Sequence, residues 1–175
     1  MIRGAADALA EKGFAGTSFG EVITRTGTPR GSIYHHFPGG KSELVAEALV
    51  AVADGVTAMI DALDPRTPQD VITSFITGWR AALEAGDYRR GCAIAAVAVA
   101  GADQPELRTR SNDAFTAWRT ALAAAFHRSG LGNPRSEDLA TLCLAAVEGA
   151  LVLGRAAESG DVFDAVERQL LRLVD

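Results

Sequence analysis

The chain has 175 residues, 48% of them hydrophobic, and a formal net charge of −5 at pH 7. This length suits one or two globular domains, and the abundance of alanine, leucine, valine and arginine favours helix over sheet. Apolar runs fall short of the ~18 residues of a membrane span, and the N-terminus lacks the layout of a signal peptide. We therefore expect an all-α, cytoplasmic protein with no membrane partner.

Charge is divided unevenly along the chain. Residues 1–44 hold five basic and four acidic residues, whereas the remainder carries a net charge of −6. A binding site for a polyanion is therefore expected at the N-terminal end, if the chain has one.

The N-terminal residues predict three short helices. The first ends at Gly13, a natural C-terminal stop. The second begins at Ser18, which forms a capping-box pattern with Glu21, and it ends at Gly27. The third begins near Pro29, because proline is tolerated in a first helical turn. Two short helices joined by a glycine-containing turn predict a helix-turn-helix, whose second helix reads DNA.

The residue types of this segment suit DNA. Free amides at helix N-termini attract phosphate, and the planar fork of Arg30 can pair with guanine. Gly31 permits close approach, while Tyr34 and the two following histidines offer phosphate donors, thymine-methyl contacts or packing. A metal or catalytic role for adjacent histidines is disfavoured, because they point roughly 100° apart on a helix and no other ligand cluster is near in sequence. The candidate DNA-binding residues are Thr17, Ser18, Thr28, Arg30, Gly31, Ser32, Tyr34, His35, His36 and Lys41.

The stretch "GTSFGEVITRTGTPRGSIYHHFPGGKSEL" resembles the DNA-binding domain of TetR-family transcriptional regulators. Its "PGG" before Lys41, together with Gly91 and Cys92, is similar to the LmrA and YxaF-like subgroup. The resemblance implies a DNA-binding domain over residues 1–48 and an effector-binding and dimerisation domain over residues 49–175. Two features depart from the family pattern: the usual basic arm is absent, and Gly20 stands where some relatives carry a base-reading side chain. Either the start is truncated or minor-groove contacts are weak.

Further helices follow, about nine in all. The eighth, beginning after the loop that ends near Ser136, is apolar on almost every side and must be covered on both. We expect a second subunit to provide one cover, with a monomeric bundle as the alternative. The resemblance agrees, because the last two helices of such regulators usually pair with their symmetry mates. The candidate dimer-interface residues are Ala145, Gly149, Ala150, Leu153, Gly154, Val166 and Leu170.

Aromatic residues of the C-terminal part fit either a plain core or a ligand cavity. The resemblance favours the cavity interpretation, because these regulators hold an inducer between the same helices. Their known ligands are planar and mainly apolar. The candidate effector-binding residues are Phe75, Trp79, Phe115 and Trp118, with Arg119, His127 and Glu148 as polar anchors.

The sequence thus predicts a homodimeric repressor that binds a near-palindromic, double-stranded operator and is released by a small, mainly apolar inducer. Catalysis is not expected, because no nucleophile with its base and no metal spacing is present, and no cofactor is expected. The alternative is a helical small-molecule-binding protein, or a transcriptional activator, with weak or no operator binding.

Overall fold

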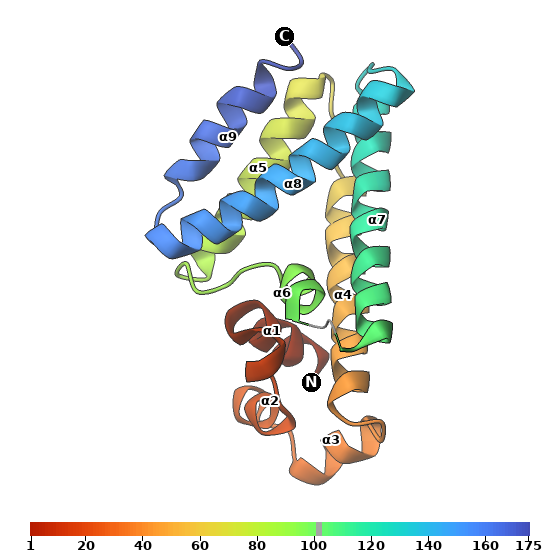
Figure 1. Cartoon of the computed structure of the whole chain (residues 1–175), viewed down its shortest axis with the longest axis vertical. Helices are drawn as coiled ribbons and strands as arrows, with labels where there is room; N and C mark the ends of the chain where they lie inside the picture. The colour runs from red at the N-terminus through yellow and green to blue at the C-terminus, as the bar shows by residue number, and fades with distance from the viewer. Residues whose placement is uncertain (101–102) are drawn as a thin grey trace. The chain divides into compact units, whose positions relative to one another are not determined.

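The chain is helical throughout the described residues, which are 1–100 and 103–175 of a computed structural model (Figure 1). These residues contain no strand, which confirms the all-α prediction. The helices are α1 Ile2–Gly16, α2 Phe19–Thr26, α3 Arg30–His36, α4 Lys41–Asp61, α5 Pro68–Ala85, α6 Ala93–Ala100, α7 Pro105–Arg128, α8 Asn133–Ala157 and α9 Asp161–Leu171.

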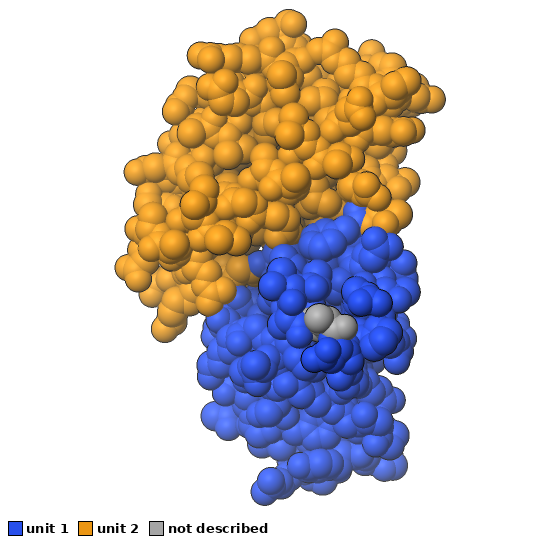
Figure 2. Space-filling view, in the orientation of Figure 1, with its two compact units in different colours: residues 1–55, 92–115 blue, residues 56–91, 116–175 orange. Residues whose placement is uncertain are grey.

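The helices form two compact units (Figure 2). Unit 1 comprises residues 1–55 and 92–115, and unit 2 comprises residues 56–91 and 116–175. Helices α4 and α7 contribute residues to both. The units therefore differ from a simple division after residue 48, because α6 and the first part of α7 belong with the N-terminal helices. The functional division at residue 48 stays a prediction.

Unit 1 is built around α1, which packs against α2 and α6. Ala5, Ala8 and Leu9 of α1 are fully buried, as are Val22 of α2 and Ile33 of α3. The predicted helix end at the thirteenth residue is instead a kink, because the helix resumes for one turn after a glycine with φ 67°. That left-handed conformation favours glycine.

Unit 2 packs α5, α8 and α9 against one another. Thr67 closes a complete capping box at the start of α5, and Arg80 of α5 bonds Asp164 of α9 over 2.7 Å. Helix α8 begins at Asn133, earlier than expected. Ser136, expected at its N-cap, is buried in the first turn and donates to the carbonyl of Gly132 over 3.1 Å.

Candidate functional site

Helices α2 and α3 form the predicted helix-turn-helix. Ser18 caps α2 by accepting the N–H of Glu21 over 3.1 Å. Gly27 ends α2 in the left-handed conformation with φ 65°, and Pro29 is the N-cap of α3. The Ser18 cap and the Gly27 stop therefore form where they were predicted, whereas the Glu21 carboxylate binds Arg25 and Lys12 and does not complete a capping box. Ile33 anchors the inner side of α3 in the core.

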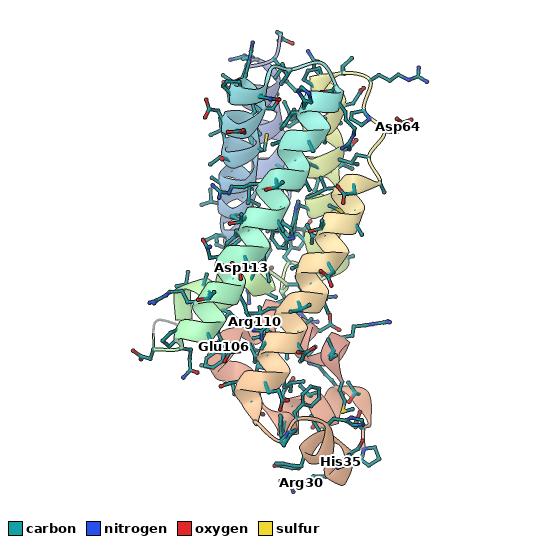
Figure 3. The ribbon with its side chains drawn as sticks, turned by 90° about the vertical axis from the view of Figure 1, so that its right-hand side faces the viewer. Arg30, His35, Asp64, Glu106, Arg110 and Asp113 are labelled. Carbon is teal, nitrogen blue, oxygen red and sulfur yellow. The ribbon has the colours of Figure 1, made fainter. Side chains whose placement is uncertain are left out.

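The outer side of α3 presents a polar row. Arg30, Tyr34 and His35 are exposed, and Arg30 and His35 project outward from the helix (Figure 3). In the part of the chain that the structure describes, the Arg30 guanidinium has no ion-pair partner. A side chain at Gly31 would meet no atom within 4 Å, so the protein's own packing does not require glycine there. The lack of a side chain leaves room for close approach from outside.

Aromatic rings support this row from below. Tyr34 keeps 53% of its surface exposed, yet its ring contacts Phe19 of α2 edge-on at 5.0 Å between centroids. Phe37, at the C-cap of α3, is buried and lies 6.4 Å from the same ring. Phe37 is therefore a core residue, whereas Tyr34 is held in place with its outer edge free.

The two histidines of α3 differ in surroundings. Their rings lie 5.7 Å apart, and His36 lines a pocket of about 560 Å³ together with Glu43 and Glu47. Across the described residues, no group of three or more histidine, cysteine and carboxylate side chains could hold a metal ion. Arg3 and Met1 line the same pocket, so cationic groups stand beside these carboxylates.

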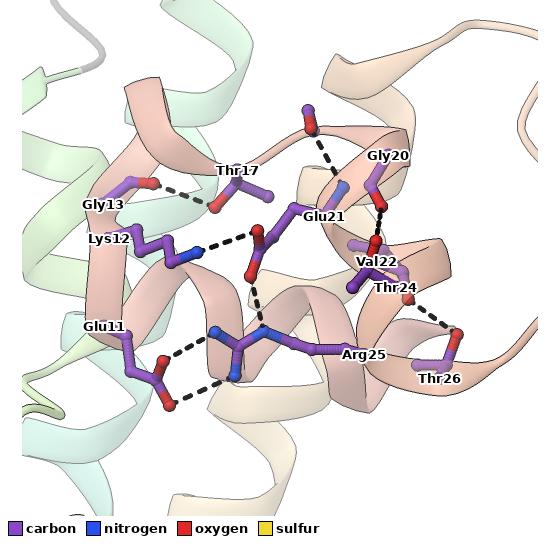
Figure 4. Close-up of polar contacts among 11 residues, drawn as sticks. Glu11, Lys12, Gly13, Thr17, Gly20, Glu21, Val22, Thr24, Arg25 and Thr26 are labelled. Atoms are coloured by element: carbon purple, nitrogen blue, oxygen red, sulfur yellow. Dashed lines mark hydrogen bonds and ion pairs between the residues drawn. The ribbon is translucent and has the colours of Figure 1, made fainter.

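Two of the candidate DNA contacts are used inside unit 1. Thr17 is fully buried, and its hydroxyl donates to the carbonyl of Gly13 over 2.9 Å (Figure 4). The Lys41 ammonium donates to the carbonyl of Phe14 over 2.5 Å and lies 4.1 Å from the centre of that ring. Partial burial lowers the pKa of Lys41. The Thr17 hydroxyl is therefore occupied inside the protein, and Lys41 links the start of α4 to the end of α1.

The remaining three candidates lie at helix ends. Ser18 is exposed, Ser32 is partly buried, and the hydroxyl of Thr28 lies 2.8 Å from that of Thr26. All three stay close to backbone amides at the starts of α2 and α3. They remain candidates for phosphate contacts.

A charge cluster that the sequence analysis did not single out joins α1 to α2 (Figure 4). Arg25 binds Glu11 through both terminal nitrogens, over 3.1 and 2.6 Å, and its Nε binds Glu21 over 3.1 Å. Lys12 pairs with the other oxygen of Glu21 over 2.8 Å. The bonds to Glu11 raise the pKa of Arg25, and the bond from Lys12 leads the contacts that lower the pKa of Glu21. Two of the basic residues near the predicted DNA-binding surface are thus neutralised within the protein.

Three of the candidate effector residues meet in unit 2. The rings of Phe75 and Trp79 lie 6.3 Å apart at 81°, and those of Trp79 and Trp118 lie 5.9 Å apart at 58°. Phe75 and Trp118 are almost fully buried, whereas Trp79 is only partly buried. Phe115 is partly buried and belongs to unit 1.

The polar anchors do not join this aromatic trio as a group. Arg119 is exposed and lines a pocket of about 380 Å³ with Glu137 and Asp138, because it points about 100° away from Trp118 on the helix. His127 is exposed and its Nδ1 lies 3.1 Å from the carbonyl of Leu131, a bond that serves the end of α7. Glu148 is partly buried on α8. An effector role for Arg119 and His127 therefore has no support from the positions of their side chains.

Helix α8 has an apolar outer face. Leu142, Val152 and Leu153 are 45%, 69% and 60% exposed, and Ala145 and Gly149 are exposed between them. By length and composition α8 could cross a membrane, a weak criterion that core helices of soluble proteins also meet.

The predicted dimer residues divide between the two sides of α8 and α9. Ala150 and Leu170 are buried within unit 2, and so is Gly154. A side chain at Gly154 would lie 2.9 Å from both Leu83 and the carbonyl of Ser159. These three residues hold unit 2 together and are not available to a partner. Val166 is partly exposed.

Comparison with known proteins identifies the family. Residues 1–48 match the model described as bacterial regulatory proteins, tetR family. Residues 68–169 match the C-terminal domain of LmrA/YxaF-like transcriptional regulators. The chain belongs to the TetR family. It is a transcriptional regulator of the LmrA/YxaF-like subgroup.

Relatives and solved structures agree with this assignment. An uncharacterized HTH-type transcriptional regulator of Mycobacterium tuberculosis strain H37Rv is 33% identical over 99% of this chain and 92% of its own. LmrA of Bacillus subtilis is 26% identical over 85% of this chain and 80% of its own. A TetR regulator from Legionella pneumophila superimposes with a TM-score of 0.86 at 20% identity, covering 99% of this chain and 95% of its own. A regulator from Rhodococcus sp. Rha1 has a TM-score of 0.78 at 26% identity, covering 99% and 92%.

Proposed function

We propose that this TetR-family regulator is a homodimeric repressor that acts in the cytoplasm and is released from a near-palindromic operator by a small, mainly apolar effector. The exposed polar row on α3 carries the proposal. It combines an unpaired Arg30, an unencumbered Gly31 and the donors of Tyr34 and His35 on one outward surface. Such a helix fits the major groove of B-form DNA.

Each residue of the row has a distinct proposed task. Arg30 pairs with two acceptors of a guanine, because its guanidinium has the planar fork that this base edge matches. Gly31 allows the backbone of α3 to approach the bases. Tyr34, His35, Ser32 and Ser18 contact phosphate or base edges, and the amides at the start of α2 bind phosphate.

Dimerisation uses the outer face of α8. A contiguous apolar strip on a helix that already packs on its other side calls for a covering surface, and a second copy supplies an identical strip related by a two-fold axis. Ala145 and Gly149 let the two helices approach closely, while Leu142, Val152 and Leu153 supply apolar area. The dimer then presents two copies of α3 to major grooves about 34–36 Å apart.

Effector response uses the aromatic trio of unit 2. Phe75, Trp79 and Trp118 offer ring faces and edges to a planar ligand, and Glu148 lies on α8 in the same unit. Helix α4 contributes residues to both units, so we propose that effector binding is transmitted through it. The ligand lowers operator occupancy if it binds the released conformation more tightly.

A mobility-shift titration with the DNA upstream of the protein's own gene tests the proposal. We expect a specific complex that an unrelated duplex of equal length does not compete away, and loss of this preference in Arg30→Ala. Equal binding to both duplexes by the wild-type protein would contradict operator recognition and favour a ligand-binding protein without that function.

A further inference from the structure

The indole N–H of Trp79 is buried and, over the described ranges 1–100 and 103–175, has no hydrogen-bond partner. An indole nitrogen can only donate. Buried tryptophan N–H groups usually find an acceptor, because leaving one unmet loses the hydrogen bond it made with water. The unmet donor therefore marks a position where an acceptor is missing from the protein itself.

Trp79 also lies where a fully covered side chain would be expected. It falls on the same side of α5 as Ile72, Ile76 and Leu83, which are all almost completely buried. Trp79 nevertheless stays partly accessible. The Trp79 side chain is therefore not sealed on every side, although the rest of this helix face is covered.

The surroundings define the shape of what could contact the indole. The Trp79 ring is in contact with Phe75 nearly at right angles and with Trp118 at an oblique angle. Such rings leave edges and faces for a flat aromatic partner, which adds to the apolar contact area. An acceptor at the edge of that partner would meet the Trp79 donor.

We infer that Trp79 selects the effector by donating its indole N–H to an oxygen or nitrogen acceptor on a planar aromatic ligand, such as an aromatic carbonyl compound. This inference rests on the proposed effector site. It goes further by separating acceptor-bearing aromatics from hydrocarbons and from cations that carry no acceptor. A ligand without an acceptor leaves the N–H unmet on binding and is disfavoured for that reason.

A matched pair of probes tests the donor. Fluorenone and fluorene are planar and nearly equal in size, and only fluorenone carries a carbonyl oxygen. Equilibrium dialysis against the full-length protein should show that fluorenone binds about threefold to tenfold more tightly than fluorene, the range set by one neutral hydrogen bond. Trp79→Phe removes the donor and keeps an aromatic ring, so it should bind both probes equally. Trp118→Phe changes a ring of the same trio and should retain the preference.

The outcomes separate this inference from the proposed function. Equal affinities for the two probes in the wild-type protein would overturn the donor role of Trp79 and leave effector binding in place. A preference that persists in Trp79→Phe would assign the acceptor to another residue, and binding of neither probe would also overturn the inference. Operator binding and circular dichroism on the same samples report separately on repression and folding, and Trp79→Met provides a second variant without the donor.

Discussion

The guanidinium of Arg25 on α2 donates two parallel hydrogen bonds, of 3.1 and 2.6 Å, to the carboxylate of Glu11 on α1. Both side chains are about three-quarters covered, and the Nε of Arg25 donates to Glu21. A basic residue inside a helix-turn-helix would ordinarily be assigned to DNA. Here its donors are directed at the protein, so Arg25 fixes the angle at which α2 leaves α1 and thereby positions α3.

Glu11→Gln distinguishes positioning from DNA contact. If Arg25 positions α2, loss of the ion pair between Arg25 and Glu11 should lower operator affinity by about fivefold, equivalent to ~1 kcal/mol, with an unchanged salt dependence. If Arg25 were a latent phosphate contact, the same change would free its charge, raise the affinity and steepen the salt dependence. Fluorescence anisotropy across a salt series measures both quantities. Glu106→Gln breaks the exposed pair between Glu106 and Arg110, 3.2 Å apart on α7 (Figure 3), and should leave operator binding unaltered.

The salt dependence of operator binding should be modest for a dimeric regulator. Lys12 and Arg25 are paired with carboxylates, and Lys41 is bonded to a carbonyl, which leaves Arg3 and Arg30 as exposed cations in this segment. Two such contacts per protomer predict a log–log slope of about −3 to −4 for the dimer. A slope steeper than about −7 would show that the paired cations are released on binding DNA.

Dimerisation should depend on Gly149. A side chain at this position meets no atom of its own protomer within 4 Å, so Gly149→Leu leaves the isolated fold intact. Across a close helix contact it should cost ~1–3 kcal/mol at each of the two symmetric sites. Sedimentation velocity should therefore show a shift toward monomer, and operator affinity should fall with it. Gly55→Leu on α4, also exposed and without neighbours, is the matched control and should remain dimeric. A Gly149→Leu protein that stays dimeric would place the interface elsewhere.

Acid should weaken the tie between α5 and α9. The bond from Arg80 lowers the pKa of Asp164 below its ordinary value of 3.8. A carboxylate with a lowered pKa in the folded state contributes stability above its unfolded pKa and loses it as pH falls through the folded one. Urea unfolding should thus show Asp164→Asn less stable than wild type at pH 7, with the difference vanishing below about pH 3. Asp113→Asn, on the exposed side of α7, should track the wild type at both pH values.

The sequence predicted the helix-turn-helix well because its signals are local. The Ser18 cap, the left-handed Gly27 and Pro29 each act within one turn of the backbone. The roles of Thr17 and Lys41 could not be predicted in this way, because they depend on the kink at Gly13 and on the position of Phe14.

Helix α8 shows a second limit of the sequence. It is apolar on nearly all sides, so periodicity cannot tell the inward side from the outward one. Small residues were assigned to the dimer interface as one group, but Ala150 and Gly154 pack inside unit 2 while Gly149 faces out. The exposed Leu142 and Val152 were missed for the same reason. Leu142, Gly149 and Val152 recur at helical spacing, but this pattern identifies the outward side only once the buried side is known.

Base-specific reading by Arg30 is the central claim, and a panel of operators with single base-pair substitutions tests it most directly. Arg30→Ala should lose about 1–3 kcal/mol on the intact operator and should become indifferent to substitutions at one position in each half-site, while other positions keep their effects. Lys41→Ala is the control, because it removes a bond to Phe14 and should weaken all operators alike. If Arg30→Ala lowers affinity equally for every operator in the panel, Arg30 contacts only the DNA backbone and the account of α3 as the base-reading helix is contradicted.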